Sequence, residues 1–306
     1  MTATVEGYRG SVLAAIAQAL TLLLTGSVGG EVAAMTPREK AAALVVAGMP
    51  AEGGFGGVLV RSWNTELPPP RRSIVFADQE GGLVKTFTSI APWQAASGYR
   101  SAHEAYRAGR ETATALRGVG AHATFAPVLD LGDGPLGSRH FESPGYGVAF
   151  ARGLGRAACP KHFPGLGSTP RSTDEARVHG SVRQHDLAPF RAAVRAGVPC
   201  VMVGHAIYPQ LGSRRASFEP KTYRLLRRLG FRGVAITDSL GVLGSPYAPF
   251  WARLAIRAGA DLVLTTSSRD AARMVEALVP LARSGALDQK VVRVLRYRRT
   301  LGVRAR

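Results

Sequence analysis

Short apolar runs alternate along this chain with longer segments in which apolar residues recur every three or four positions. The short runs are typical of buried strands and the longer segments of helices packed by one face. Seven strands are expected, at 56–60, 73–77, 122–131, 157–162, 199–204, 233–238 and 261–265. If the strands form an eight-stranded barrel, the eighth is either missing or a short segment within 43–46. Helices are expected from Thr36 and at 103–117, 146–156, 187–196, 222–229, 248–258, 269–283 and 289–301.

Strands that alternate with helices pair in parallel through right-handed crossovers. The length of 306 residues lies within the usual range of one barrel of this kind. The sequence therefore predicts an α/β protein, a (β/α)8 TIM-like barrel that is incomplete or distorted.

Residues 1–34 differ in composition from residues 35–306, which form the expected barrel domain. Arg9 precedes an apolar stretch at 12–24, and Val32-Ala33-Ala34 resembles a cleavage site. This outline is typical of a secretory signal, so we expect export to the cell envelope or beyond. If the stretch is instead an extra N-terminal helix, the protein stays in the cytoplasm.

The formal net charge of +18 comes almost entirely from arginine. These arginines are spread along the whole chain and form no basic helix with interleaved aromatics, so no specific nucleic-acid partner is expected. Weak attraction to anionic wall polymers or lipid head groups is the remaining functional interpretation. The oligomeric state is left open.

The two cysteines, Cys159 and Cys200, both fall in expected buried strands. Two residues cannot form a disulfide framework or a zinc site. We expect two buried thiols, with a single bridge as the alternative if the two strands are neighbours.

Three of the apolar runs end in ionisable residues, at Asp78, at Lys161-His162 and at Asp238. Either aspartate could simply cap a following helix. Because carboxyl ends of parallel strands meet on one face of a barrel, however, all three ends together predict a shared polar site there.

The residues at these strand ends belong to motifs that resemble glycoside hydrolase family 3, in its β-N-acetylhexosaminidase branch. The resemblance runs from about Thr36 to the C-terminus. Its five motifs, in order, are Asp78-Gln79-Glu80-Gly81-Gly82, Ala126-Pro127-Val128-Leu129-Asp130, Gly137-Ser138-Arg139-His140-Phe141, Lys161-His162-Phe163-Pro164-Gly165 and Ile236-Thr237-Asp238-Ser239-Leu240.

The resemblance implies a retaining glycosidase, in which one carboxylate attacks the anomeric carbon and a second group protonates the leaving oxygen. Asp238 matches the nucleophile of the family. Substrate-binding positions of the family are matched by Asp78, Arg139, Lys161 and His162.

Two of the polar residues have alternative roles. Lys161 could be a buried partner of a carboxylate such as Asp130. His205, which follows the expected strand at 199–204, either contacts the ligand or belongs to the scaffold.

The loop after the Lys-His motif departs from the family, which carries an Asp-x-His pair there as acid/base. An alignment without a gap places this pair at Ser172 and Asp174, and an alignment with a two-residue gap places it at Asp174 and Ala176. Neither alignment leaves a histidine in the pair. Asp174 could donate the proton itself if burial raised its pKa, whereas Glu175 and His179 are weaker candidates. The alternative is a solvated linker without a donor.

Two further departures concern the loop after Asp78 and the 153–159 connection. Leu83 and Thr86 stand where the family usually has arginines, so one substrate-anchoring cation is missing. The connection is short for a helix and a strand.

Taken together, the residues predict an enzyme that removes β-linked N-acetylglucosamine, from cell-wall-derived glycans, without a metal or organic cofactor. The alternatives are a sugar-binding barrel of the same family that has lost catalysis, and a binder of nucleic acid or wall polymer.

Overall fold

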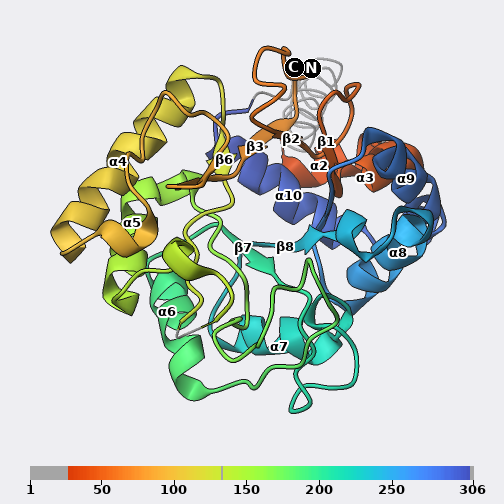
Figure 1. Cartoon of the computed structure of the whole chain (residues 1–306). Coiled ribbons are helices and arrows are strands. Elements are labelled where there is room, and N and C mark those ends of the chain that lie inside the picture. The colour runs from red at the N-terminus through yellow and green to blue at the C-terminus, as the bar shows by residue number, and fades with distance from the viewer. Residues whose placement is uncertain (1–26, 132–133, 304–306) are drawn as a thin grey trace, which may run out of the picture.

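The computed structural model describes residues 27–131 and 134–303 and contains a curved sheet of seven parallel strands. Their order is β6-β3-β2-β1-β9-β8-β7, and helices surround them on the outside (Figure 1). Most of these strands are buried on both faces, which explains their continuous apolar sequences. The strands are β1 (Val45–Gly48), β2 (Gly57–Val60), β3 (Ile74–Ala77), β6 (Ala123–Thr124), β7 (Cys200–Val203), β8 (Val234–Ser239) and β9 (Leu262–Thr265).

The segment 158–163 occupies the gap between the two edge strands, β6 and β7. Isolated parallel bridges join Ala158 to Thr124 on one side and Phe163 to Val203 on the other. Prolines at 127, 160 and 164 donate no backbone hydrogen bond, so a regular ladder cannot form here. The fold is therefore an incomplete (β/α)8 barrel, as predicted.

Three strand expectations need adjustment. The strand expected at 122–131 is reduced to β6, and the one at 157–162 becomes the irregular segment between β6 and β7. The short strand sought within 43–46 is β1, which begins and ends two residues later. The short 153–159 connection fits because a 3-10 turn, Gly155–Ala157, replaces part of the expected helix.

The helices begin and end close to the expected positions. Thr36 caps α3 (Pro37–Ala42): its hydroxyl accepts from the Glu39 backbone, and the Glu39 carboxylate accepts from the Thr36 backbone in return. The other main helices are α4 (Ala102–Gly118), α5 (Pro144–Leu154), α6 (Gln184–Arg195), α7 (Pro220–Arg228), α8 (Ala248–Ala258), α9 (Ser268–Arg283) and α10 (Asp288–Thr300).

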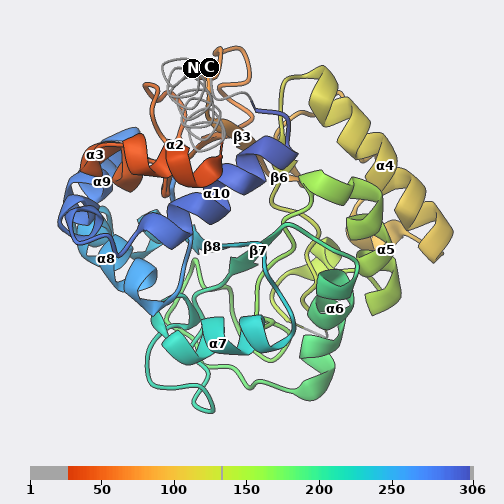
Figure 2. The ribbon, with the colours of Figure 1, turned by 180° about the vertical axis from the view of Figure 1, so that it is seen from behind.

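The chain before α3 contains a helix that packs on the barrel. Helix α2 (Val28–Ala34) lies beside α10 (Figure 2), where Val32 is buried and Glu31 pairs with Arg298 and, at 2.9 Å, with Arg299. The expected cleavage site thus falls within α2. The apolar stretch at 12–24 lies outside the described residues. Within the described ranges, no helix has the length and apolar character needed to cross a membrane.

The two cysteines form a disulfide, with a sulfur–sulfur distance of 2.11 Å. The expectation of two buried thiols was wrong and the alternative of a single bridge is confirmed, because the 158–163 segment and β7 are neighbours in the barrel. The bridge from Cys159 to Cys200 links the segment that carries Lys161 to the regular sheet.

Candidate active site

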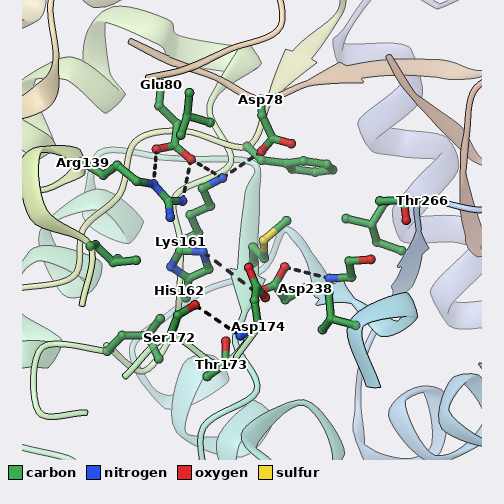
Figure 3. A pocket seen from close by; sticks show the side chains of 18 of the residues that line it. Asp78, Glu80, Arg139, Lys161, His162, Ser172, Thr173, Asp174, Asp238 and Thr266 are labelled. Atoms are coloured by element: carbon green, nitrogen blue, oxygen red, sulfur yellow. Dashed lines mark hydrogen bonds and ion pairs between the residues drawn. The ribbon is translucent and has the colours of Figure 1, made fainter. Parts of the chain in front are cut away.

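A cavity of about 320 Å³ opens at the carboxyl ends of the strands (Figure 3). Its base includes the apolar side chains of Leu59, Phe125, Met202 and Leu264, and most of the other residues that line it are polar. The sequence-predicted residues that line it are Asp78, Arg139, Lys161, His162, Asp174 and Asp238, joined by Glu80. Residues far apart in the chain therefore meet in one pocket.

Two carboxylates and two cations form a network on one side of the cavity (Figure 3). Lys161 Nζ lies 2.9 Å from Asp78 Oδ1 and 2.6 Å from Glu80 Oε1. Arg139 donates from Nε and Nη2 to the two Glu80 oxygens, at 2.8 and 2.9 Å. The alternative partner for Lys161, Asp130, is instead bonded to His162. Each buried charge thus has an opposite charge beside it.

Sequence reasoning did not single out Glu80 as a site residue. It lies in β4 (Gln79–Gly81), which forms a hairpin with β5 (Val84–Lys85), and its side chain is only 3% exposed. Residues two positions apart in an extended segment point to the same side, so Glu80 follows Asp78 into the cavity. A buried acid two residues after a strand-end aspartate is the pattern that could have identified it.

The network favours the ionised forms of Glu80 and Lys161. Burial alone would raise the pKa of Glu80, but the charges of Lys161 and Arg139 outweigh it and lower that pKa. Burial alone would lower the pKa of Lys161, but the negative charges of Asp78 and Glu80 outweigh burial and raise that pKa. The site therefore presents fixed charges to a polar ligand.

Asp130 orients the imidazole of His162 through a contact with its Nδ1 atom. Its Oδ2 lies 2.7 Å from His162 Nδ1 and also accepts the His162 backbone N–H, at 3.1 Å. Its Oδ1 accepts the backbone N–H of Leu166, at 2.7 Å. These contacts fix the ring so that Nε2 faces Asp238, with 4.0 Å between Nε2 and Asp238 Oδ2.

Asp238 lies near the end of β8, and 18% of its side chain is exposed, within the lining of the cavity. Burial would raise its pKa, but His162, His205 and the backbone N–H of Ser239 lower it overall. The Ser239 N–H donates to Asp238 Oδ1 at 2.7 Å. The residue therefore offers an ionised carboxylate oxygen to the cavity.

Asp174 reaches the same cavity from the loop that follows the 158–163 segment (Figure 3). Its backbone N–H donates to Ser172 Oγ at 3.2 Å. Partial burial of the carboxyl, followed by the negative charge of Asp238, raises its pKa. Of the two weaker candidates on this loop, neither Glu175 nor His179 lines the cavity.

His205 does not line the cavity. Its ring is buried, with Nδ1 2.8 Å from Ser217 Oγ and Nε2 3.1 Å from the Ser239 carbonyl. Both ring nitrogens are occupied by the protein, which favours the scaffold alternative. From this position the imidazole supports the backbone beside Asp238.

The positions of the two missing arginines have different environments. Thr86 is buried, and its hydroxyl accepts the backbone N–H of Asp78 at 3.1 Å. Leu83 is 93% exposed. Neither side chain supplies a charge to the cavity.

This fold and site define a class of enzyme: a parallel α/β barrel whose ionisable residues lie at the carboxyl ends of its strands. The N-terminal domain model of glycosyl hydrolase family 3 matches residues 59–297. This match spans most of the chain, which therefore belongs to glycoside hydrolase family 3.

Known proteins of the family are similar to this chain in sequence and in fold. A beta-hexosaminidase of Stenotrophomonas maltophilia (strain K279a) is 35% identical over 225 residues, covering 64% of this chain and 67% of the relative. A family 3 beta-N-acetylglucosaminidase from Paenibacillus sp. str. FPU-7 superposes with a TM-score of 0.78 at 26% identity, over 88% of this chain and 63% of that one. A family 3 glycosyl hydrolase of Mycobacterium smegmatis str. MC2 155 superposes with a TM-score of 0.75 at 28% identity, over 90% of this chain and 99% of that one.

Proposed function

We propose that this protein is a retaining β-N-acetylglucosaminidase in which Asp238 is the nucleophile and Asp174 the acid/base. The observation that carries the proposal is that the carboxyl groups of Asp238 and Asp174 line one cavity. Partial burial and the charge of Asp238 raise the pKa of Asp174, whereas burial of Asp238 is outweighed by the charges of His162 and His205, which lower its pKa. Such a pair suits a mechanism that needs one ionised and one protonated carboxyl group.

In the first step, an Asp238 oxygen attacks the anomeric carbon while the bond to the leaving oxygen breaks. The proton of Asp174 passes to that oxygen, and a glycosyl-aspartate ester forms. In the second step, Asp174 takes a proton from water, whose oxygen attacks the anomeric carbon and releases Asp238 as a carboxylate. Two inversions at one carbon retain its configuration.

The charged network is suited to hold the sugar that is released. Asp78 can accept hydrogen bonds from hydroxyls, while Arg139, Lys161 and His162 can donate to them, and charge-assisted bonds of this kind are strong and directional. The N-acetylglucosamine specificity is proposed from the names of the similar proteins, a beta-hexosaminidase and a beta-N-acetylglucosaminidase.

Cell-wall-derived glycans in the envelope are the proposed natural setting. The apolar stretch at 12–24 supports export, and the net charge of +18 supports attraction to anionic wall polymers. The second candidate function is a sugar-binding barrel without catalysis, which is favoured by the absence of the histidine that the family carries in the Asp174 loop.

Hydrolysis of two N-acetylglucosaminides separates these candidates. With a nitrophenyl leaving group, which needs little protonation, the Asp238→Ala variant should lose activity. The Asp174→Ala variant should keep much of its kcat/KM, which reports the first step, while its kcat falls because the second step lacks its base. With an alkyl leaving group, both variants should be impaired, because this oxygen leaves only with a proton. Sugar binding without hydrolysis of either substrate by the wild type would instead establish the binding barrel.

A further inference from the structure

Large apolar side chains are exposed on the loops that follow the carboxyl ends of the strands. Trp63 is 74% exposed on the loop after β2, and Leu83 and Trp93 are exposed on the segment after β3. Tyr247, 62% exposed, lies after β8. Such side chains near a site commonly mark a surface that binds a ligand or a partner.

The loop that carries Trp63 is held in place. Asn64 is buried, its Oδ1 accepts the Arg61 backbone N–H at 2.7 Å, and its Nδ2 donates to the Met49 carbonyl at 2.9 Å. The guanidinium of Arg61 lies 4.7 Å from the centroid of the Trp63 ring. The exposed indole is thus supported by a cation and by an anchored turn, which orients it before any ligand arrives.

Trp63 does not itself line the catalytic cavity, but it borders the cavity through Arg61. Arg61, the residue on which it stacks, is part of the cavity lining. Among the residues that the structure describes, Arg61 forms no ion pair with a carboxylate, whereas Arg139 and Lys161 are both paired. Its guanidinium is therefore free to donate to a ligand that extends from the cavity toward Trp63.

The shape of the cavity determines the direction in which a longer ligand extends from it. Apolar barrel residues close the base, so any part of a substrate beyond the bound terminal sugar must leave through the mouth. A flat, exposed indole at that mouth can stack on the apolar face of a sugar ring, as aromatic side chains do with other flat or cyclic groups.

We infer that Arg61 and Trp63 form an additional sugar-binding subsite, which stacks a second residue of an oligosaccharide substrate at the mouth of the cavity. The inference rests on the proposed N-acetylglucosaminidase function. It assigns the protein a preference for oligosaccharides over single glycosides with small leaving groups.

The test compares kcat/KM for β1,4-linked N-acetylglucosamine dimer and tetramer with that for the nitrophenyl glycoside. Trp63→Ala should lower kcat/KM for the oligomers by about fivefold more than for the nitrophenyl glycoside, since a stacked aromatic pair contributes about 1 kcal/mol. Trp63→Phe should restore part of this difference. Tyr247→Ala is the matched control, because Tyr247 is also an exposed aromatic residue after a strand, but its strand, β8, lies three positions from β2 in the sheet.

Equal losses on all three substrates in Trp63→Ala would overturn the inference, as would loss of the oligomer preference in Tyr247→Ala alone. Calorimetry with the tetramer and with N-acetylglucosamine separates this failure from failure of the proposed function. If the wild type hydrolyses nothing but Trp63→Ala still weakens tetramer binding selectively, the subsite stands and the catalytic proposal does not. Equal tetramer affinity in wild type and Trp63→Ala would remove the subsite.

Discussion

The carboxylate of Glu80 lies 2.6 Å from the ammonium nitrogen of Lys161, and both side chains are almost completely buried. The same carboxylate receives two hydrogen bonds from Arg139. Glu80 therefore sets the position of two of the cations that we assign to sugar binding, although it need not touch the sugar itself.

Replacing Glu80 by glutamine should weaken both folding and substrate binding. Loss of one partner leaves Lys161 and Arg139 with less compensation in a buried site, so the free energy of unfolding should fall by about 3 kcal/mol. KM should rise more than kcat falls. Urea denaturation and steady-state kinetics measure the two effects.

A matched control for this variant is Glu142→Gln, because Glu142 pairs with Arg100 on the exposed surface. Its free energy of unfolding should change by less than about 1 kcal/mol. Equal stability of the two variants would contradict the role given to Glu80. The lowered pKa of Glu80 also predicts a pH effect: its stabilising contribution is present above the unfolded-state pKa and is lost as the pH falls through the folded-state value.

The pH dependence of kcat/KM on an alkyl glycoside should be bell-shaped. Activity should fall on the acid side as Asp238, whose pKa is lowered, becomes protonated, and on the alkaline side as Asp174, whose pKa is raised, loses its proton. In Asp174→Asn the alkaline limb should disappear along with most of the activity. An unchanged alkaline limb in that variant would assign the proton donor elsewhere.

Asp130→Asn should reduce kcat/KM by about tenfold or more, because an amide NH2 in the place of Oδ2 cannot accept the hydrogen bond that orients the His162 ring. An amide oxygen in the place of Oδ1 can still accept the backbone N–H groups of Leu166 and His162, which lie 2.7 and 3.2 Å from Oδ1, so the protein should fold. Protein NMR of the His162 ring in wild type and variant checks whether the imidazole has changed its environment. A reduced rate with an unaltered His162 signal would exclude this positioning role.

Removing the disulfide with the double substitution Cys159→Ala and Cys200→Ala should lower the free energy of unfolding by about 3 kcal/mol. The bridge closes a loop over a sequence separation of 41 residues, and this loop contains the Asp174 segment. Denaturant curves of wild type with and without reductant provide the comparison. A variant as stable as the oxidised wild type would show that the bridge does not stabilise the fold.

The helices and the buried strands could be predicted because their signals are local. The Thr36 and Glu39 capping pair marks the start of α3, and the apolar run of β9 needs no distant information. The location of Asp78, Lys161 and Asp238 in one cavity could also be predicted, since parallel strands end on the same face of a barrel.

What the sequence could not reveal depends on contacts between distant segments. The pairing of Glu80 with Arg139, 59 positions away along the chain, exists only in the folded protein. The Cys159–Cys200 bridge required knowledge of which segment lies beside β7. The burial of His205 between Ser217 and Ser239 likewise could not be distinguished from exposure at a strand end.

The central claim is that Asp238 forms the covalent bond to the sugar. Incubation with a fluorinated N-acetylglucosaminyl donor that slows release of the intermediate, followed by proteolysis and mass spectrometry, tests it directly. We predict one added sugar on the peptide that contains Asp238, and none in the Asp238→Ala variant. A sugar attached to Asp174 or to any other residue would contradict the account.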